Sequence, residues 1–176
     1  NVVIGDNAMT SSSGASNSIV IGQGAAVLMT GDNNTVVGYE AYRSGTTGSY
    51  NVLMGYQVGY AASQVNSVII GFRAGYVNTA NSNVYIGGEA GRNNTSGGNN
   101  VFIGPDAGYA NVTGSSNTFV GTQAGTYQTG LYNTAIGHIA LFGSSTAGAS
   151  NASYNTAVGY KAGNVITSGA ENTLIG

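Results

Sequence analysis

The chain has 176 residues, of which only 6% are charged, and its formal net charge is −2. This charge balance excludes the basic footprint typical of nucleic-acid binding and the polybasic segment that anionic membranes attract. The chain contains no cysteine, so neither disulfides nor thiolate metal sites contribute to its stability. No apolar run approaches the roughly 18 residues of a membrane-spanning helix. We therefore expect no nucleic-acid partner and no membrane insertion by this segment.

One short motif recurs eleven times along the whole chain. It consists of Asn (twice Ser), a β-branched residue, an apolar residue, an aliphatic residue and Gly, and a clear copy begins at Asn155. We call its last residue the anchoring glycine. The anchoring glycines are Gly5, Gly22, Gly38, Gly55, Gly71, Gly87, Gly104, Gly121, Gly137, Gly159 and Gly176.

The spacing of the anchoring glycines is 16 or 17 residues, except for one step of 22 residues. A short fixed period is typical of a solenoid. The sequence therefore predicts an all-β fold, a parallel β-roll or β-solenoid of about ten turns of 16–17 residues, as a single repetitive domain over residues 1–176. The chain begins and ends inside the motif, whereas solenoid ends usually carry atypical caps, so we expect a fragment of a longer fibre.

The three residues before each anchoring glycine predict a strand that is apolar on both faces. The first and third positions, such as Val84 and Ile86, share one face, and the middle position, such as Tyr85, Phe102 and Phe119, takes the other. Strands that are apolar on both faces are covered on both sides. We expect the first and third positions to face the core. The middle position would then be covered by another copy of the chain or, alternatively, by a second wall of the same chain.

The rest of each rung also repeats. The Asn four residues before the anchoring glycine predicts an amide ladder from rung to rung, with a row of sugar-binding amides as the alternative. Nine alanines and one valine stand three residues after the glycine and indicate a tight inward position. Each rung is therefore expected to hold two short strands and two turns. The 22-residue step predicts an insertion within residues 143–153, either a neutral bulge or a loop on a binding face.

The titratable side chains are too scattered to suggest catalysis. The single histidine, His138, has only Thr and Tyr at the matching positions one rung away, so we expect no ligand cluster. Arg73 and Glu89 lie one rung apart and could pair as an exposed ion pair, while Glu89 and Asp106 stack as like charges that could attract a cation. We expect no enzyme activity, no catalytic residue, no cofactor and no metal site.

The aromatic residues are the candidate surface-binding residues. Tyr39, Tyr56 and Phe72 directly follow the anchoring glycine in three consecutive rungs and predict a surface stack. A tyrosine ring combines an apolar body with a polar tip, which suits contact with a sugar. Stacking of the rings only on each other is the alternative. A second aromatic set stands five residues after the anchoring glycine: Tyr60, Tyr76 and Tyr109.

The motif, as in residues 117–121 (Asn-Thr-Phe-Val-Gly) and 155–159 (Asn-Thr-Ala-Val-Gly), resembles the repeats of trimeric autotransporter adhesin heads (YadA-like). It is also similar to repeats in bacteriophage tail fibres. The resemblance covers the whole chain. It implies a left-handed parallel β-roll and a homotrimer, displayed extracellularly on a cell or virion surface for attachment to a surface glycan or a protein receptor. The rungs here are slightly longer than is usual in those adhesin heads.

These observations favour a non-enzymatic extracellular fibre segment that serves attachment, either as an adhesin head or as a phage tail fibre. A purely structural extracellular filament or spacer without receptor binding is the alternative. The threonine row at positions 118, 134, 156 and 173 prompts a third hypothesis, an ice-binding solenoid. We expect this row to face the core, and its expected burial argues against ice binding.

Overall fold

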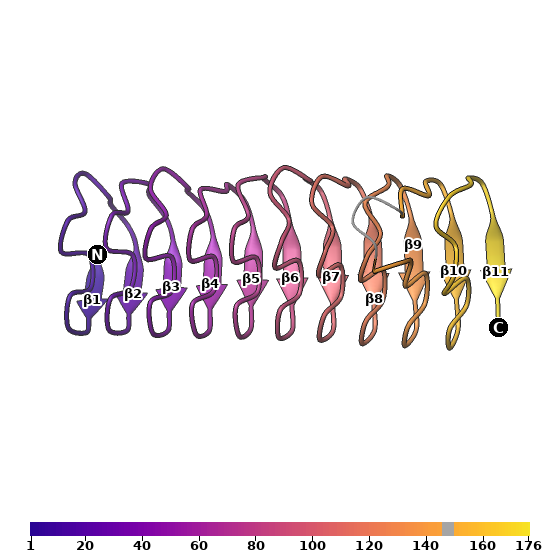
Figure 1. The fold of residues 1–176 in the computed structure, drawn as a ribbon. Helices are drawn as coiled ribbons and strands as arrows, with labels where there is room; N and C mark the ends of the chain where they lie inside the picture. Colours follow the sequence, from indigo (N-terminus) through magenta and orange to yellow (C-terminus); the bar gives the residue numbers. More distant parts are fainter. Residues whose placement is uncertain (146–149) are drawn as a thin grey trace.

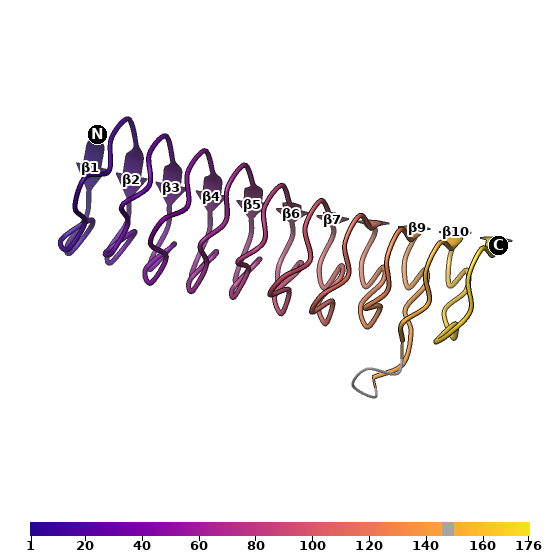
Figure 2. The same ribbon diagram turned by 90° about the horizontal axis from the view of Figure 1, so that it is seen from above.

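The computed structural model describes residues 1–145 and 150–176. Eleven three-residue strands form one parallel sheet in sequence order, and the described part of the chain contains no helix. The rungs follow one another in single file from the N-terminus to the C-terminus, both in side view (Figure 1) and from above (Figure 2). The predicted all-β solenoid of about ten turns is confirmed. The strands are β1 (Val2–Ile4), β2 (Ile19–Ile21), β3 (Thr35–Val37), β4 (Val52–Met54), β5 (Val68–Ile70), β6 (Val84–Ile86), β7 (Val101–Ile103), β8 (Thr118–Val120), β9 (Thr134–Ile136), β10 (Thr156–Val158) and β11 (Thr173–Ile175).

Neighbouring strands pair without any shift in register, so every motif position forms a column along the solenoid. In β6 and β7, for example, Tyr85 lies beside Phe102. The 22-residue step keeps the same register, because Thr134 of β9 lies beside Thr156 of β10. The extra residues are therefore accommodated outside the sheet. Residues 146–149 of the expected insertion at 143–153 lie outside the described residues, so its role stays a prediction.

The middle residue of each strand faces the core, and the expected assignment of the two strand faces is wrong. Tyr85, Phe102 and Phe119 are fully buried within the single chain. Their rings stack at centroid distances of 5.0 and 4.9 Å. The first and third strand positions point outward instead, because consecutive strand residues alternate between faces. Large rings gain most from burial, which explains why the interior takes the middle column.

The opposite wall leaves room for these side chains by a matched change of size. Where the middle residue is Phe102, the residue four after the anchoring glycine is Gly108, and a Cβ there would lie 2.5 Å from the phenyl ring. Where the middle residue is the smaller Ala135, the matching position holds the buried Leu141. The alanine column three after the glycine is buried between them, as expected. The two walls thus fill the interior jointly, at the close packing typical of protein cores.

Each rung contains one strand, and the expected second strand is absent from the described rungs. The return wall is a column of tight turns. Asp106 and Gly108 both have left-handed backbone conformations, with φ of 57° and 59°, and a strand cannot continue through them. This wall is nevertheless bonded from rung to rung, since the amide of Gly108 donates to the carbonyl of Ala124 (3.0 Å). Parallel backbone hydrogen bonding therefore continues outside the sheet.

The Asn column is a buried hydrogen-bond ladder. The side-chain oxygen of Asn100 accepts from the backbone amide of Asn117 (2.9 Å), and its Nδ2 donates to the carbonyl of Gly114 (2.8 Å). Where Ser67 replaces Asn, its hydroxyl accepts from the backbone amide of Asn83 (3.2 Å). The ladder is confirmed. The alternative of a sugar-binding row is wrong because Asn83, Asn100 and Asn117 are fully buried.

The anchoring glycines also form a column, at the point where each strand turns. Gly87 has a φ of 140°, and a Cβ on it would lie 2.6 Å from the carbonyl carbon of Gly104 in the next rung. Its neighbour Gly88 lies outside this column, and a Cβ there would meet nothing within 4 Å. Close backbone approach between rungs is therefore what requires glycine at this position.

Two interior tyrosines carry perturbed hydroxyls. Tyr42 accepts a hydrogen bond from the amide of Gly48 (2.9 Å), and burial raises its pKa to about 12. Burial also raises the pKa of Tyr85 well above its usual value, although the nearby amide of Asn100 acts in the opposite direction. Among the described residues the Tyr85 hydroxyl has no hydrogen-bond partner of normal geometry. Both tyrosines therefore stay neutral in the folded chain at neutral pH.

Candidate functional site

The outward face of the sheet is a continuous apolar surface that runs along the solenoid. It consists of the first and third residues of the strands, such as Val84 and Ile86, and we call it the outer strip. Ile86 and Ile103 are 37% and 36% exposed, and Val158 is 37% exposed. Neither column of the outer strip contains a charged residue. A long, regular apolar surface of this kind makes the outer strip a candidate interaction face.

The threonine row belongs to this strip, which is contrary to expectation. Thr118, Thr134 and Thr156 are the first residues of their strands, and their middle neighbours occupy the core. The row therefore lies on the outside of the solenoid. A threonine adds a hydroxyl to an otherwise aliphatic strip without interrupting the strand, because it is β-branched like valine. The outer strip is thus wholly apolar at some rungs and weakly polar at others.

The predicted surface stack is confirmed. Tyr39, Tyr56 and Phe72 stack in order, with centroid distances of 5.3 and 5.4 Å and interplanar angles of 9° and 14°. Inside such a stack the ring faces cover one another, and the rings present their edges to solvent. The guanidinium carbon of Arg73 lies 5.2 Å from the centroid of Phe72, so Phe72 also carries a cation–π contact. The stack as a whole is therefore no continuous platform for a flat ligand.

A second aromatic column includes an arginine that the sequence reasoning missed. Tyr60 stacks on Tyr76 at 5.1 Å. In the next rung Arg92 takes the same position, with its guanidinium carbon 5.9 Å from the ring of Tyr76 and 5.8 Å from the ring of Tyr109. It also donates a hydrogen bond to the Tyr109 hydroxyl (3.1 Å). The shared spacing of five residues after the anchoring glycine was the signal that would have found Arg92.

The charged side chains pair differently from the prediction. The Nε of Arg73 donates to the amide oxygen of Gln57 (2.9 Å), and the Gln57 amide in turn donates to Glu40 (2.8 Å). Glu89 pairs with Arg92 at 3.5 Å rather than with Arg73. The expected Arg73–Glu89 pair is therefore wrong. A neutral amide in the preceding rung competes successfully because it lies in the same column and completes a chain of hydrogen bonds.

The structure brings no metal-binding cluster together in the part of the chain that it describes. Among these residues no three His, Cys, Asp or Glu side chains are placed to hold an ion. Glu89 and Asp106 both line one shallow hollow. His138 is exposed on the surface, where its ring is tilted against Tyr160 at a centroid distance of 5.6 Å.

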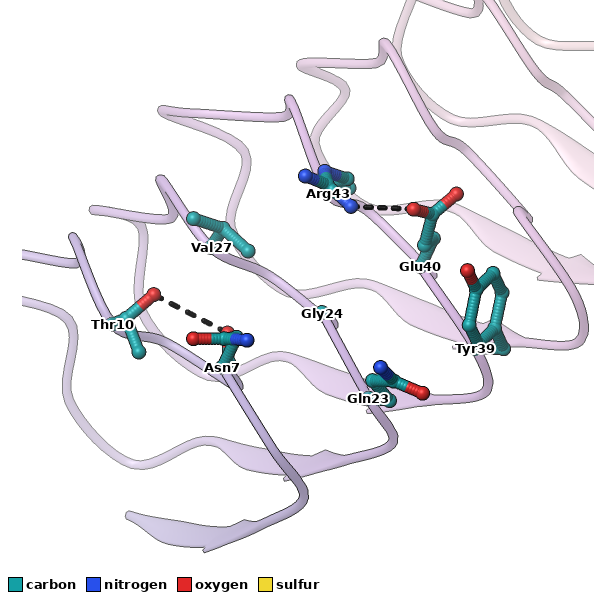
Figure 3. Close-up of a pocket in the computed structure, with 8 residues that line it drawn as sticks. All are labelled: Asn7, Thr10, Gln23, Gly24, Val27, Tyr39, Glu40 and Arg43. Atoms are coloured by element: carbon teal, nitrogen blue, oxygen red, sulfur yellow. Dashed lines mark hydrogen bonds and ion pairs between the residues drawn. The ribbon is translucent and has the colours of Figure 1, made fainter.

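A hollow of ≈ 330 Å³ lies where the aromatic stack ends (Figure 3). Its walls come from the segments that follow three successive strands, β1, β2 and β3. The aromatic side is Tyr39, and the polar side includes Glu40 and Arg43, which form an ion pair. The lining residues are Asn7, Thr10, Gln23, Gly24, Val27, Tyr39, Glu40 and Arg43. Of the expected surface-binding residues, Tyr39 lines this hollow.

Comparison with known proteins adds no relationship. No family model, no curated protein and no solved structure matches the chain. Within the described residues, no helix combines the length and hydrophobicity needed to cross a membrane.

Proposed function

We propose that this chain is a non-enzymatic segment of an extracellular fibre, that copies of it associate side by side through the outer strip, and that the assembly serves attachment to a cell surface or receptor. The observation that carries the proposal is the outer strip itself. Two columns of aliphatic and β-branched side chains run the length of the sheet. In the single chain most residues of the third-position column, such as Ile86 and Ile136, are exposed, and the first-position residues of β3 to β10 are half-buried. The described chain has no second sheet to cover them.

The size of the outer strip suits association. Three residues at roughly 3.3 Å and eleven strands at roughly 4.8 Å make a strip of about 10 by 50 Å. Pressing two such strips together removes on the order of 1,000 Å² from water, which is near the lower limit for a specific interface. Side chains flanking the strip would add to this area. The strip can therefore support an assembly without any contribution from charged contacts.

A second copy of the chain is the occupant that fits best. Its strands repeat at the same spacing, so one favourable contact between copies recurs at every rung. Because both columns lack charges, two copies face each other without repulsion or buried ions. Identical chains usually close into symmetric rings. Three copies are the number implied by the resemblance to trimeric adhesin heads and tail fibres.

The non-enzymatic part of the proposal rests on how the polar side chains are used. The buried amides of Asn83, Asn100 and Asn117 are committed to backbone hydrogen bonds in the ladder. The surface charges of Glu40, Arg73 and their neighbours are spread along columns and paired locally. Repetition of one structural unit, rather than convergence of unlike groups on one point, characterises this surface.

The oligomeric state of the chain tests the proposal. Sedimentation velocity is expected to give a homotrimer for the unmodified chain. The double variant Ile86→Lys/Ile103→Lys places two like charges in the outer strip of each copy and is expected to give monomers with an unchanged circular dichroism spectrum. Thr122→Lys, which adds one exposed charge on the return wall, is the control and is expected to remain trimeric.

Each other outcome of this measurement is informative. A monomeric unmodified chain at micromolar concentration would overturn the association. A dimer would retain the outer strip as the interface and contradict the threefold assembly. Binding of the intact assembly to host cells or immobilised glycans then tests attachment, and uniformly blank results would favour the purely structural filament.

A second candidate function is favoured by one observation. The threonine row that prompts the ice-binding hypothesis lies on the outside, so burial no longer argues against it. Thr118, Thr134 and Thr156 stand at successive rungs beside aliphatic residues on a regular surface. Measurement of thermal hysteresis decides between the two, because a strip covered by other copies has no surface left for ice. Thermal hysteresis in a monomeric preparation would favour ice binding over the fibre.

A further inference from the structure

Two surface columns end at the same rung, and their ends create the hollow beside Tyr39. The first column is the aromatic stack that begins at Tyr39, and the preceding rung has Gln23 in place of a ring. The second column is the hydrogen-bonded series that begins at Glu40, and the preceding rung has Gly24 in place of a long side chain. The space that these side chains would fill is the hollow of ≈ 330 Å³ (Figure 3).

Tyr39 is the one ring of this stack that offers a face to a ligand. The faces of Tyr56 are covered by the rings on both sides, and Phe72 at the far end lies against the guanidinium of Arg73. Tyr39 is stacked only toward Tyr56 and is 43% exposed. Its other face lies on the side of the hollow, as the lining residues show.

Polar groups of both kinds surround this ring face. Glu40 supplies carboxylate oxygens, Arg43 supplies guanidinium donors, and the two neutralise each other as an ion pair. Asn7 and Gln23 supply amides that both donate and accept. The hollow therefore combines a flat apolar surface with donors and acceptors and has no net charge of its own.

We propose that this hollow is a binding site for a neutral sugar residue of a surface glycan. A sugar ring has an apolar C–H face that packs on an aromatic ring and a rim of hydroxyls that both donate and accept hydrogen bonds. The hollow matches both features. An ionic ligand fits less well, because Glu40 and Arg43 already neutralise each other as an ion pair. The volume is at the lower end of the roughly 300–1,000 Å³ typical of small-ligand pockets. This inference rests on the proposed attachment function and specifies its ligand class.

Filling the hollow is the sharpest perturbation. Gly24→Gln restores the residue that occupies this column in the rung of Gln57. Gly24 has a φ of 64° and Gln57 has a φ of 49°, so the backbone at this position already accepts glutamine elsewhere in the fold. A Cβ at Gly24 would lie 3.5 Å from its nearest neighbours, which is ordinary contact. The variant is therefore expected to fold and to lose the space for a sugar.

The experiment is saturation-transfer NMR with three probes, the methyl glycosides of glucose, galactose and N-acetylglucosamine, at millimolar concentration. At least one probe is expected to receive saturation from the unmodified assembly. Titration of that signal gives the dissociation constant, which Gly24→Gln and Tyr39→Ala are each expected to raise at least about tenfold, equivalent to about 1.4 kcal/mol. Tyr160→Ala removes another exposed tyrosine that directly follows an anchoring glycine and is expected to leave the signal unchanged.

The results separate this site from the proposed function. No transfer to any of the three probes, or equal transfer from the unmodified chain and from Gly24→Gln, would overturn the sugar site. Sedimentation of the same samples reports the assembly independently, because the hollow lies on the return wall and the interface on the outer strip. If the chain is trimeric but binds no probe, the sugar site is refuted and the proposed association stands. If the chain is monomeric but binds a probe, the association is refuted and the sugar site stands.

Discussion

Replacing Asn100 by alanine removes one complete step of the buried amide ladder. The substitution leaves the backbone amide of Asn117 without its acceptor and the carbonyl of Gly114 without its donor. Each buried group that loses its partner costs about 1–3 kcal/mol, so the free energy of unfolding should fall by about 2–6 kcal/mol. Asn100→Ser retains a hydroxyl acceptor for Asn117, as Ser67 does for Asn83, and should lose about 1–3 kcal/mol.

Urea unfolding followed by circular dichroism measures both losses. All variants must be compared at one protein concentration, because association through the outer strip would add to apparent stability. Amide hydrogen exchange gives a local check, since Asn117 should lose protection in the alanine variant and keep most of it in the serine variant. Equal stability of the two variants, or a loss below about 1 kcal/mol for alanine, would refute the ladder's role in stability.

Three further predictions concern the columns of the solenoid. Gly87→Ala should lower the free energy of unfolding by at least about 2 kcal/mol, because its Cβ would press on the next rung, whereas adjacent Gly88→Ala should change it by no more than about 0.5 kcal/mol. Thermal melting compares the pair, and equal melting temperatures would contradict the close approach. Phe102→Ala removes the middle ring of the interior stack and should cost about 3–5 kcal/mol in urea titration; a loss under about 1 kcal/mol would mean that the stack is not tightly packed. Because burial raises the pKa of Tyr42 and Tyr85, the folded chain holds these protons more tightly than the unfolded chain. Their contribution to the free energy of unfolding is therefore fully present below about pH 10, and the contribution of Tyr42 is lost as the pH rises through about 12. Urea midpoints should fall over this range and fall less in Tyr42→Phe, and an identical fall in both proteins would rule out Tyr42 as a contributor.

The repeat made much of the fold readable from the sequence. The nearly constant spacing of the anchoring glycines predicted the rungs. The three residues before each glycine predicted the strands, whose observed bounds coincide with those residues. The same columns predicted the Asn ladder and the stack of Tyr39, Tyr56 and Phe72. In-register stacking explains this success, because residues that share a motif position become neighbours whatever the rung's detailed shape.

The strand face that enters the core was not decided by this pattern. Both faces are apolar, so the alternation of residues along the strand did not distinguish the core face from the outward face. The sequence held a weaker signal in the complementary sizes of Phe102 with Gly108 and of Ala135 with Leu141. This signal can be interpreted only when the distance across the rung is known, because the two residues of each pair lie on opposite walls.

The sequence by itself determined the period, the strands and the columns, because these depend on local preference and on repetition along one axis. The tertiary structure alone decided what lies across each rung and at the ends of columns. In the structure Arg73 bonds to the neutral side chain of Gln57, and the return wall consists of turns rather than a second strand. A hollow also lies beside Tyr39. Those outcomes depend on the cross-section of the rung, where side-chain volumes from different parts of the motif compete for the same space.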